Sequence, residues 1–181
     1  MNLDGYLMDG RFAADAKKLG YESTTFDATL PAAAFSERLP AAARASLAHV
    51  AQMLTNGSFP ELYSFGISQH SWAFDFAAND VEVLNADFEG DLSGDVFSMA
   101  TDGGGNHYCL AVDGKVVIWN HEESNIEDHT QFASLDEALW ALLHYEAVKD
   151  DKIPYDAIRA AFAEYPAECG VAFLRDELDE R

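Results

Sequence analysis

Residues 96–123 read VFSMATDGGGNHYCLAVDGKVVIWNHEE and hold the clearest strand pattern in the chain. Two apolar runs, His107–Val112 and Lys115–Asn120, are separated only by Asp113 and Gly114. An Asp-Gly pair between such runs predicts a β-hairpin, because both central residues of a type I′ turn need a positive φ. With this two-residue loop, the predicted cross-strand pairs are Val112 with Lys115, Leu110 with Val117 and Tyr108 with Trp119.

This register predicts a hairpin that is apolar on both faces, because cross-strand partners share a face of the sheet. The face opposite Tyr108 and Trp119 would carry His107, Cys109, Ala111, Val116, Ile118 and Asn120. Such a strand pair belongs at the centre of a sheet, with helices or another layer on each face. We therefore expect one α+β domain with a largely antiparallel sheet, packed by helices and followed by a C-terminal helical extension.

Three glycines at positions 103–105 precede the hairpin, between Asp102 and Asn106. Glycine permits backbone dihedrals closed to other residues, so we expect a tight, irregular approach into the strand. The loop does not match a phosphate-binding loop, since no Gly-Lys-Ser/Thr follows it. A strand pattern comes next, whereas a dinucleotide-binding glycine motif opens a helix.

Helix signals flank the hairpin on both sides. Pro40 suits the first turn of a helix, and Asn56-Gly57 supplies a left-handed stop. Ser134 and Glu137 form a capping-box signature, which predicts a helix that begins at Ser134. The other predicted helices are 10–19, 40–55, 154–165 and 171–178, and the predicted strands outside the hairpin are 61–67, 72–76, 81–88 and 96–100.

Four features follow one another in order: Leu39-Pro40 at a helix start, Asn56-Gly57 at its end, DGGGNHY at 102–108 and GKVVIWNH at 114–121. With the helix after Phe132, this order resembles the SUKH superfamily, which groups yeast cell-wall-synthesis regulators with many bacterial toxin-immunity proteins. The resemblance covers roughly residues 25–145. It implies a single SUKH-like domain over 1–181, with a core at about 25–145 and extensions at 1–24 and 146–181. It also implies a protein-binding function without catalysis.

The charge of the chain narrows the class of partner. The formal net charge is −21, from 32 acidic and 11 basic residues. Such a field repels nucleic acids and anionic membranes, which bind clustered Lys and Arg, and it accelerates association with a basic protein. We therefore expect a basic protein partner, and neither nucleic acid nor a membrane.

Composition also indicates the compartment. Apolar residues make up 49% of the chain, which is typical of a globular protein, and no apolar run reaches the length of a transmembrane helix. The first residues lack the basic region and apolar stretch of a signal peptide, so we expect a cytoplasmic protein. Cys109 and Cys169 are then expected to be reduced, with Cys109 buried in its strand.

Candidate chemical groups lie around the hairpin, but their spacing matches no catalytic pattern. The cluster that could bind a metal is His107, His121, His129, Glu122, Glu123 and Asp128. Its spacing fits neither His-Glu-x-x-His on a helix nor a zinc finger. Cys109 and His107 point the same way on one strand, about 6–7 Å apart, which is long for proton transfer. We therefore expect no catalytic residues, no metal ion and no cofactor.

The resemblance to the SUKH superfamily, together with the acidic charge, thus implies an immunity protein that neutralises a bacterial polymorphic toxin, with nucleases as one class of toxin, by binding its basic toxin domain. The predicted partner-binding residues are Asp102, Asn106, Trp119, His121, Glu122 and Glu123, clustered at one end of the hairpin. Two alternatives remain open at this point. One is a regulatory scaffold protein of the same superfamily, and the other is a small metal-dependent hydrolase that uses the His/Glu loop.

Overall fold

In the computed structural model the described residues are 2–26, 31, 33–65, 67, 95–102, 104–123, 125–127 and 130–180. The helices are α1 (Arg11–Lys18), α2 (Ala33–Arg38), α3 (Ala41–Asn56), η1 (Tyr63–Phe65, a 3₁₀ turn), α5 (Leu135–Lys149), α6 (Asp156–Phe162) and α7 (Gly170–Asp179). The strands are β1 (Ser23–Thr24), β2 (Phe59–Pro60), β3 (Val96–Thr101), β4 (His107–Ala111), β5 (Val116–Asn120) and β6 (Asn125–Ile126).

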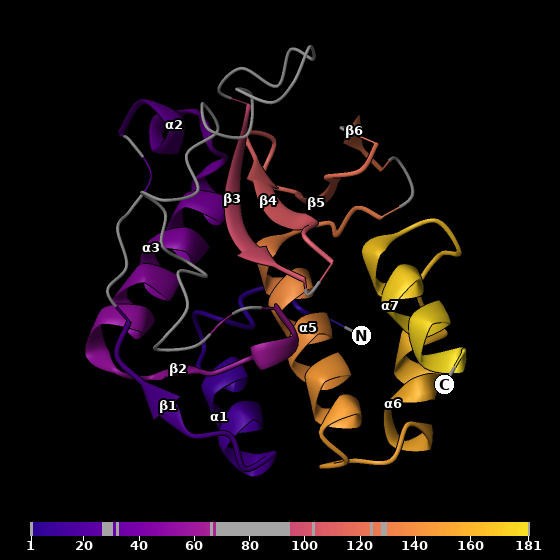
Figure 1. Ribbon diagram of the computed structural model, residues 1–181. Helices are drawn as coiled ribbons and strands as arrows, with labels where there is room; N and C mark the ends of the chain where they lie inside the picture. The colour runs from indigo at the N-terminus through magenta and orange to yellow at the C-terminus, as the bar shows by residue number, and fades with distance from the viewer. Residues whose placement is uncertain are drawn as a thin grey trace.

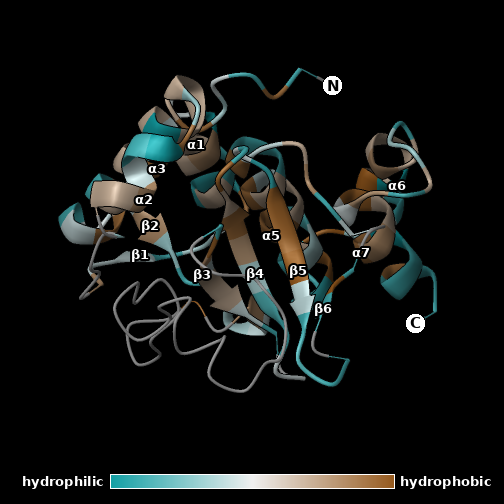
Figure 2. Cartoon of the chain, turned by 90° about the horizontal axis from the view of Figure 1, so that it is seen from above, coloured by the Kyte–Doolittle hydropathy of each residue, from teal (hydrophilic) through white to brown (hydrophobic). Residues whose placement is uncertain are grey.

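The described strands form two antiparallel sheets, which confirms the predicted α+β class. Strands β1 and β2 make a small pair, and the larger sheet has the order β3-β4-β5-β6. The larger sheet stands in the middle of the molecule, with α3 on one side and α6 and α7 on the other (Figure 1). Seen from above, its apolar strands lie between these two groups of helices (Figure 2). The hairpin is therefore central, as predicted.

The register of the β4–β5 hairpin differs by one residue from the prediction. The observed pairs are His107 with Trp119, Tyr108 with Ile118, Cys109 with Val117 and Leu110 with Val116. The loop has three residues, since the Gly114 amide donates to the Ala111 carbonyl at 2.8 Å and the Ala111 amide donates to the Lys115 carbonyl at 2.8 Å. Gly114 has φ +89°, whereas Asp113 is not among the described residues with positive φ. This is the hairpin with a glycine bulge, in place of a type I′ turn.

The corrected register changes which side chains share a face. Tyr108, Leu110, Val116 and Ile118 pack into the main core with residues of α3 and α5. Val96, Cys109, Val117 and Trp119 form a second buried cluster on the other face. Both faces are apolar, as expected, but Trp119 lies with Cys109 and not with Tyr108.

Apart from α2, which lies in a stretch where the sequence predicted no helix, the α-helices follow their sequence signals. Helix α3 begins after Pro40 and ends at Gly57, which has φ +71°. At the start of α5, Ser134 accepts a hydrogen bond from the Glu137 amide, while the Glu137 carboxylate reaches the Ala133 amide. In a standard capping box Glu137 would accept from the amide of Ser134, the N-cap residue. Here it accepts from the amide of the preceding residue, Ala133. Within the described ranges, no helix is both long and apolar enough to cross a membrane.

The predicted strand 61–67 is wrong where the structure describes it. Leu62 and Ile67 pair as an isolated bridge and exchange hydrogen bonds of 2.7 and 3.0 Å, so the chain closes into a tight turn that contains η1. The turn buries Phe65, whose ring meets those of Tyr108 and Tyr145. The predicted strand 96–100 is confirmed as β3. Strands predicted at 72–76 and 81–88 lie outside the described residues.

Both predicted extensions contribute to the main core. In the N-terminal segment, Tyr6, Leu7 and Phe12 are buried, and in the C-terminal segment Phe162 and Val171 are buried. The core of the fold therefore extends beyond the range 25–145.

A single buried carboxylate joins the N-terminal segment to two helices. Asp136, in the first turn of α5, accepts hydrogen bonds from the Leu7 amide at 2.9 Å and from the Ser46 hydroxyl of α3 at 2.8 Å. Asp136 and Ser46 are both buried. Hydrogen bonds to a buried ionised group are among the stronger ones in proteins, so this contact fixes the relative position of three segments.

We predict that Gly114→Ala destabilises the fold more than Gly20→Ala does. Both glycines have positive φ, where alanine costs about 1–2 kcal/mol. A methyl group on Gly114 would also lie 3.0 Å from the Ala43 side chain, whereas one on Gly20 would meet nothing within 4 Å. Urea unfolding of the two variants measures the difference. Equal losses of unfolding free energy in the two variants would show that the close approach of the hairpin loop to α3 does not affect stability.

We predict that Asp136→Ala lowers the free energy of unfolding by about 2–4 kcal/mol, because the buried Leu7 amide loses its partner. Ser46→Ala should cost about 1 kcal/mol, and the double variant should lose less than the sum. The control is Asp156→Ala, an exposed acidic residue in the first turn of α6, with an expected loss of about 0.5 kcal/mol. Equal effects of Asp136→Ala and Asp156→Ala on urea unfolding would contradict the bridging role.

Candidate partner-binding site

The six predicted partner-binding residues lie at one end of the hairpin, where β4 begins and β5 ends. Asp102 and Asn106 belong to the loop between β3 and β4, and His121, Glu122 and Glu123 form the turn between β5 and β6. Trp119 comes from the end of β5 but is only 5% exposed, with its ring 5.3 Å from that of His107. Trp119 therefore lies beneath the surface that the other five residues form.

Asp102 organises the glycine loop. Its Oδ1 accepts from the Gly104 amide at 2.8 Å and from the Asn106 amide at 2.9 Å, and its Oδ2 accepts from the Asn106 side chain at 2.9 Å. Gly105 has φ +100°, and a Cβ there would lie 3.3 Å from the His121 ring. This position therefore needs glycine both for its backbone and for the close approach of the ring.

Asn106 connects the glycine loop to the next turn. Its Oδ1 accepts a hydrogen bond from the His121 amide at 3.2 Å and lies 3.2 Å from His121 Nδ1. An amide oxygen only accepts, so this contact assigns the proton of a neutral His121 ring to Nδ1. Two loops that are distant in the sequence are thus held as one surface.

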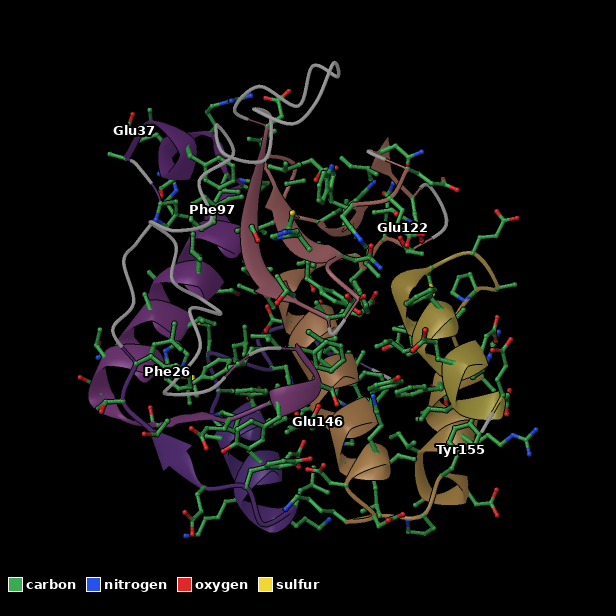
Figure 3. The ribbon with its side chains drawn as sticks, in the orientation of Figure 1. Phe26, Glu37, Phe97, Glu122, Glu146 and Tyr155 are labelled. Atoms are coloured by element: carbon green, nitrogen blue, oxygen red, sulfur yellow. The ribbon has the colours of Figure 1, made fainter. Side chains whose placement is uncertain are left out.

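The β5–β6 turn is fixed by a residue that the sequence interpretation did not select. Asn120 Oδ1 accepts from the amides of Glu122 at 2.9 Å and Glu123 at 3.1 Å, and its Nδ2 donates to Glu127 at 2.7 Å. An Asn whose side chain bonds to the backbone two residues on is a known turn signal, so the sequence held this information. The glutamates are exposed, and Glu122 projects beside β6 (Figure 3).

A serine–histidine pair lies just below this surface. Ser98 Oγ is 2.8 Å from His107 Nδ1, and Ser98 is fully buried. Burial lowers the pKa of His107, while Asp102 opposes this effect and His121 adds to it. The pair forms across β3 and β4 beside the irregular step between Ser98 and Ala100, so the sequence could not reveal it. With the serine sealed from solvent, the contact is structural.

Cys109 is a buried thiol, as predicted. Burial raises its pKa to about 12, so it is protonated at neutral pH. Its Sγ lies 3.8 Å from the His107 carbonyl oxygen, while the His107 ring contacts Ser98. The thiol thus packs as a small apolar group.

The structure also bears on the metal hypothesis. Within the part of the chain that it describes, no group of three His, Cys, Asp or Glu side chains could hold a metal ion. His129 and Asp128, two members of the sequence cluster, lie outside the described residues. Of the remaining members, His121 hydrogen-bonds to an amide oxygen and the ring of His107 contacts a hydroxyl.

Comparisons of this chain with protein-family models, with curated proteins and with solved structures find no match. The likeness to the SUKH superfamily therefore rests on the ordered motifs of the sequence. The function has to be argued from the geometry and charge of the site, because a fold class alone does not define a function.

We predict that the His107 ring titrates below its ordinary pKa of 6.5, as measured by NMR. Asp102→Asn should lower this pKa further, because it removes the neighbouring charge that raises it, and His121→Gln should raise it. Unfolding restores the ordinary value, so the unfolded chain binds more protons just below pH 6.5. Stability should therefore fall as the pH drops from 6.5 through the folded pKa.

Glu122→Gln is the matched control, since it removes an exposed charge from the adjacent turn. It should leave the His107 titration unchanged. A shift with Glu122→Gln as large as that with Asp102→Asn would mean that the general acidity of the protein, and not this loop, controls the ring.

Proposed function

We propose that this protein is a non-enzymatic binding module that holds a basic protein partner against the acidic end of its hairpin. The observation that carries the proposal is the geometry of the β5–β6 turn. Glu122 and Glu123 are exposed there, on a backbone held by Asn120 and Asn106.

A fixed turn suits recognition for a thermodynamic reason. Ordering a loop during association costs free energy, and a turn that is already hydrogen-bonded avoids most of that cost. The two carboxylates are thus presented in a defined position before the partner arrives. The net charge of −21 adds a long-range attraction that accelerates encounter with a basic surface.

The partner class that best fits this chemistry is a toxin domain with a basic cleft. A nuclease needs Lys and Arg to hold phosphates, and an acidic surface can occupy the same groups. We therefore propose an immunity protein of SUKH type, located in the bacterial cytoplasm, that neutralises such a toxin by masking its cleft. The motif order in the sequence and the acidity of the chain support this proposal.

Affinity purification tests the proposal directly. The tagged chain is used as bait in its native cell, and recovered proteins are identified by mass spectrometry. We expect a basic toxin domain that binds one-to-one and loses its activity in the complex. Recovery of envelope-assembly proteins alone would favour the scaffold alternative, and turnover of a substrate by the pure chain would overturn the proposal.

We predict that Glu122→Gln together with Glu123→Gln slows association with this partner several-fold and weakens its dependence on salt, as measured by stopped-flow kinetics. The control combines Asp156→Asn with Glu180→Gln, which changes the net charge equally at exposed positions elsewhere. We expect the control to have a smaller effect. Equal effects of the two pairs, or an affinity indifferent to salt, would refute an electrostatic role for the turn.

A further inference from the structure

A cavity of about 280 Å³ adjoins the glycine loop at Asp102 and Gly104. It lies between this loop, η1, α5 and α7, and its lining includes Asp102, Phe65, Tyr108, Tyr145, Lys149 and Glu177. Its volume lies just below the usual range for drug-sized ligands, about 300–1,000 Å³. The space therefore suits a single side chain or a small ion, and not a nucleotide.

One wall of the cavity is fixed by a buried carboxylate. Glu146 of α5 accepts the Ser64 amide of η1 with both oxygens, at 3.1 and 3.0 Å. Figure 3 shows Glu146 between α5 and η1. This contact holds the turn that carries Phe65, so the cavity wall is preformed.

Tyr108 supplies a polar group without a partner. The residue is only 2% exposed, and its ring packs edge-on against Phe65 with centroids 5.3 Å apart. Among the described residues its hydroxyl has no hydrogen-bond partner, whereas the hydroxyl of Tyr145 donates to Glu177 at 2.7 Å. Tyr108 lines the cavity together with Asp102 and Glu177, so its hydroxyl oxygen adds an acceptor to these two carboxylates.

The charges around Tyr108 indicate which kind of ligand the cavity attracts. Burial, and then the carboxylates of Asp102 and Glu177, raise the pKa of Tyr108 well above its usual value. The cavity is thus negative and lined by aromatic rings, a combination that attracts cations. The chain already places one there, since Lys149 Nζ lies 5.4 Å from the centroid of the Tyr145 ring.

We infer that this cavity receives one arginine or lysine side chain of the basic partner. The inference rests on the proposed function, because it takes the cation from a bound protein. The incoming group donates hydrogen bonds to Asp102, Glu177 and the Tyr108 oxygen, and it lies against the aromatic rings. Lys149 then moves aside or competes for the same space.

This assignment divides recognition into two steps. The exposed Glu122–Glu123 turn acts at a distance and raises the rate of encounter. A side chain that enters a partly enclosed pocket acts at short range and lowers the rate of dissociation, as buried Arg residues do at interaction hot spots. The glycine loop contacts both features, since Asn106 bonds to the turn and Asp102 and Gly104 line the cavity.

Small cations test the cavity in the free protein. The full chain is titrated with butylguanidinium and with its neutral counterpart butylurea, and amide shifts are followed by NMR. We expect butylguanidinium to bind in the millimolar range and to move the amides of Ser64, Gly104 and Phe173. Butylurea should not bind. Equal shifts with both probes, or no shift with either, would overturn the inference.

Three variants test whether butylguanidinium binding depends on the cavity or on the overall negative charge of the protein. Glu177→Gln keeps an acceptor for Tyr145 and should weaken butylguanidinium binding several-fold, while Lys149→Met removes the competing cation and should strengthen it. Glu180→Gln, on the exposed end of the same chain segment, should change nothing. Equal weakening by Glu177→Gln and Glu180→Gln would assign the effect to net charge and overturn the inference. Thermal melting confirms that each variant is folded.

The same variants distinguish this inference from the proposed function. If a basic partner is recovered and Glu177→Gln leaves its dissociation rate unchanged, the cavity inference fails and the proposed function stands. If butylguanidinium binds as expected and no protein partner is recovered, the proposed function fails. A final titration uses spermidine, a free polyamine. If spermidine binds much more tightly than butylguanidinium, the cavity is a polyamine site, and the inference that a partner side chain occupies it is overturned.

Discussion

The carboxylate of Asp136 is the contact on which the rest of the structure depends. It bonds to the Leu7 amide and the Ser46 hydroxyl, and so joins the N-terminal segment, α3 and α5 inside the protein. Helix α5 supports one face of the central sheet and also carries Tyr145 and Glu146. A buried charge with its bonds satisfied gives this helix a fixed position, which the sheet and the cavity both require.

The surface at the end of the hairpin is likewise built by short polar side chains. Asp102 holds the glycine loop, Asn106 connects this loop to His121, and Asn120 holds the turn that follows β5. Each of these residues bonds to backbone amides, so their main effect is to fix the chain. The displayed carboxylates of Glu122 and Glu123 and the cavity beyond Asp102 are consequences of that framework.

Local signals in the sequence predicted the helices well, because caps and apolar periodicity act within a few residues, as at Pro40, Gly57 and Ser134. The register of the hairpin could not be predicted in the same way. Asp113-Gly114 is compatible with a two- or a three-residue loop, and a shift of one residue moved Trp119 from the face of Tyr108 to the face of Cys109. The contact of Ser98 with His107 and the cavity around Tyr108 depend on strand register and helix packing, which are set by distant parts of the chain.

The hydrogen bonds that shape the β5–β6 turn come from Asn120 and Asn106, and the side chain of Glu122 takes no part in them. Position 122 can therefore change in size or charge while the backbone keeps its course. Under the proposed binding function, such an arrangement lets a contacting side chain change while the turn that carries it stays the same. A new specificity of that proposed function would then need only a single substitution at position 122, and no refolding of the scaffold that presents it.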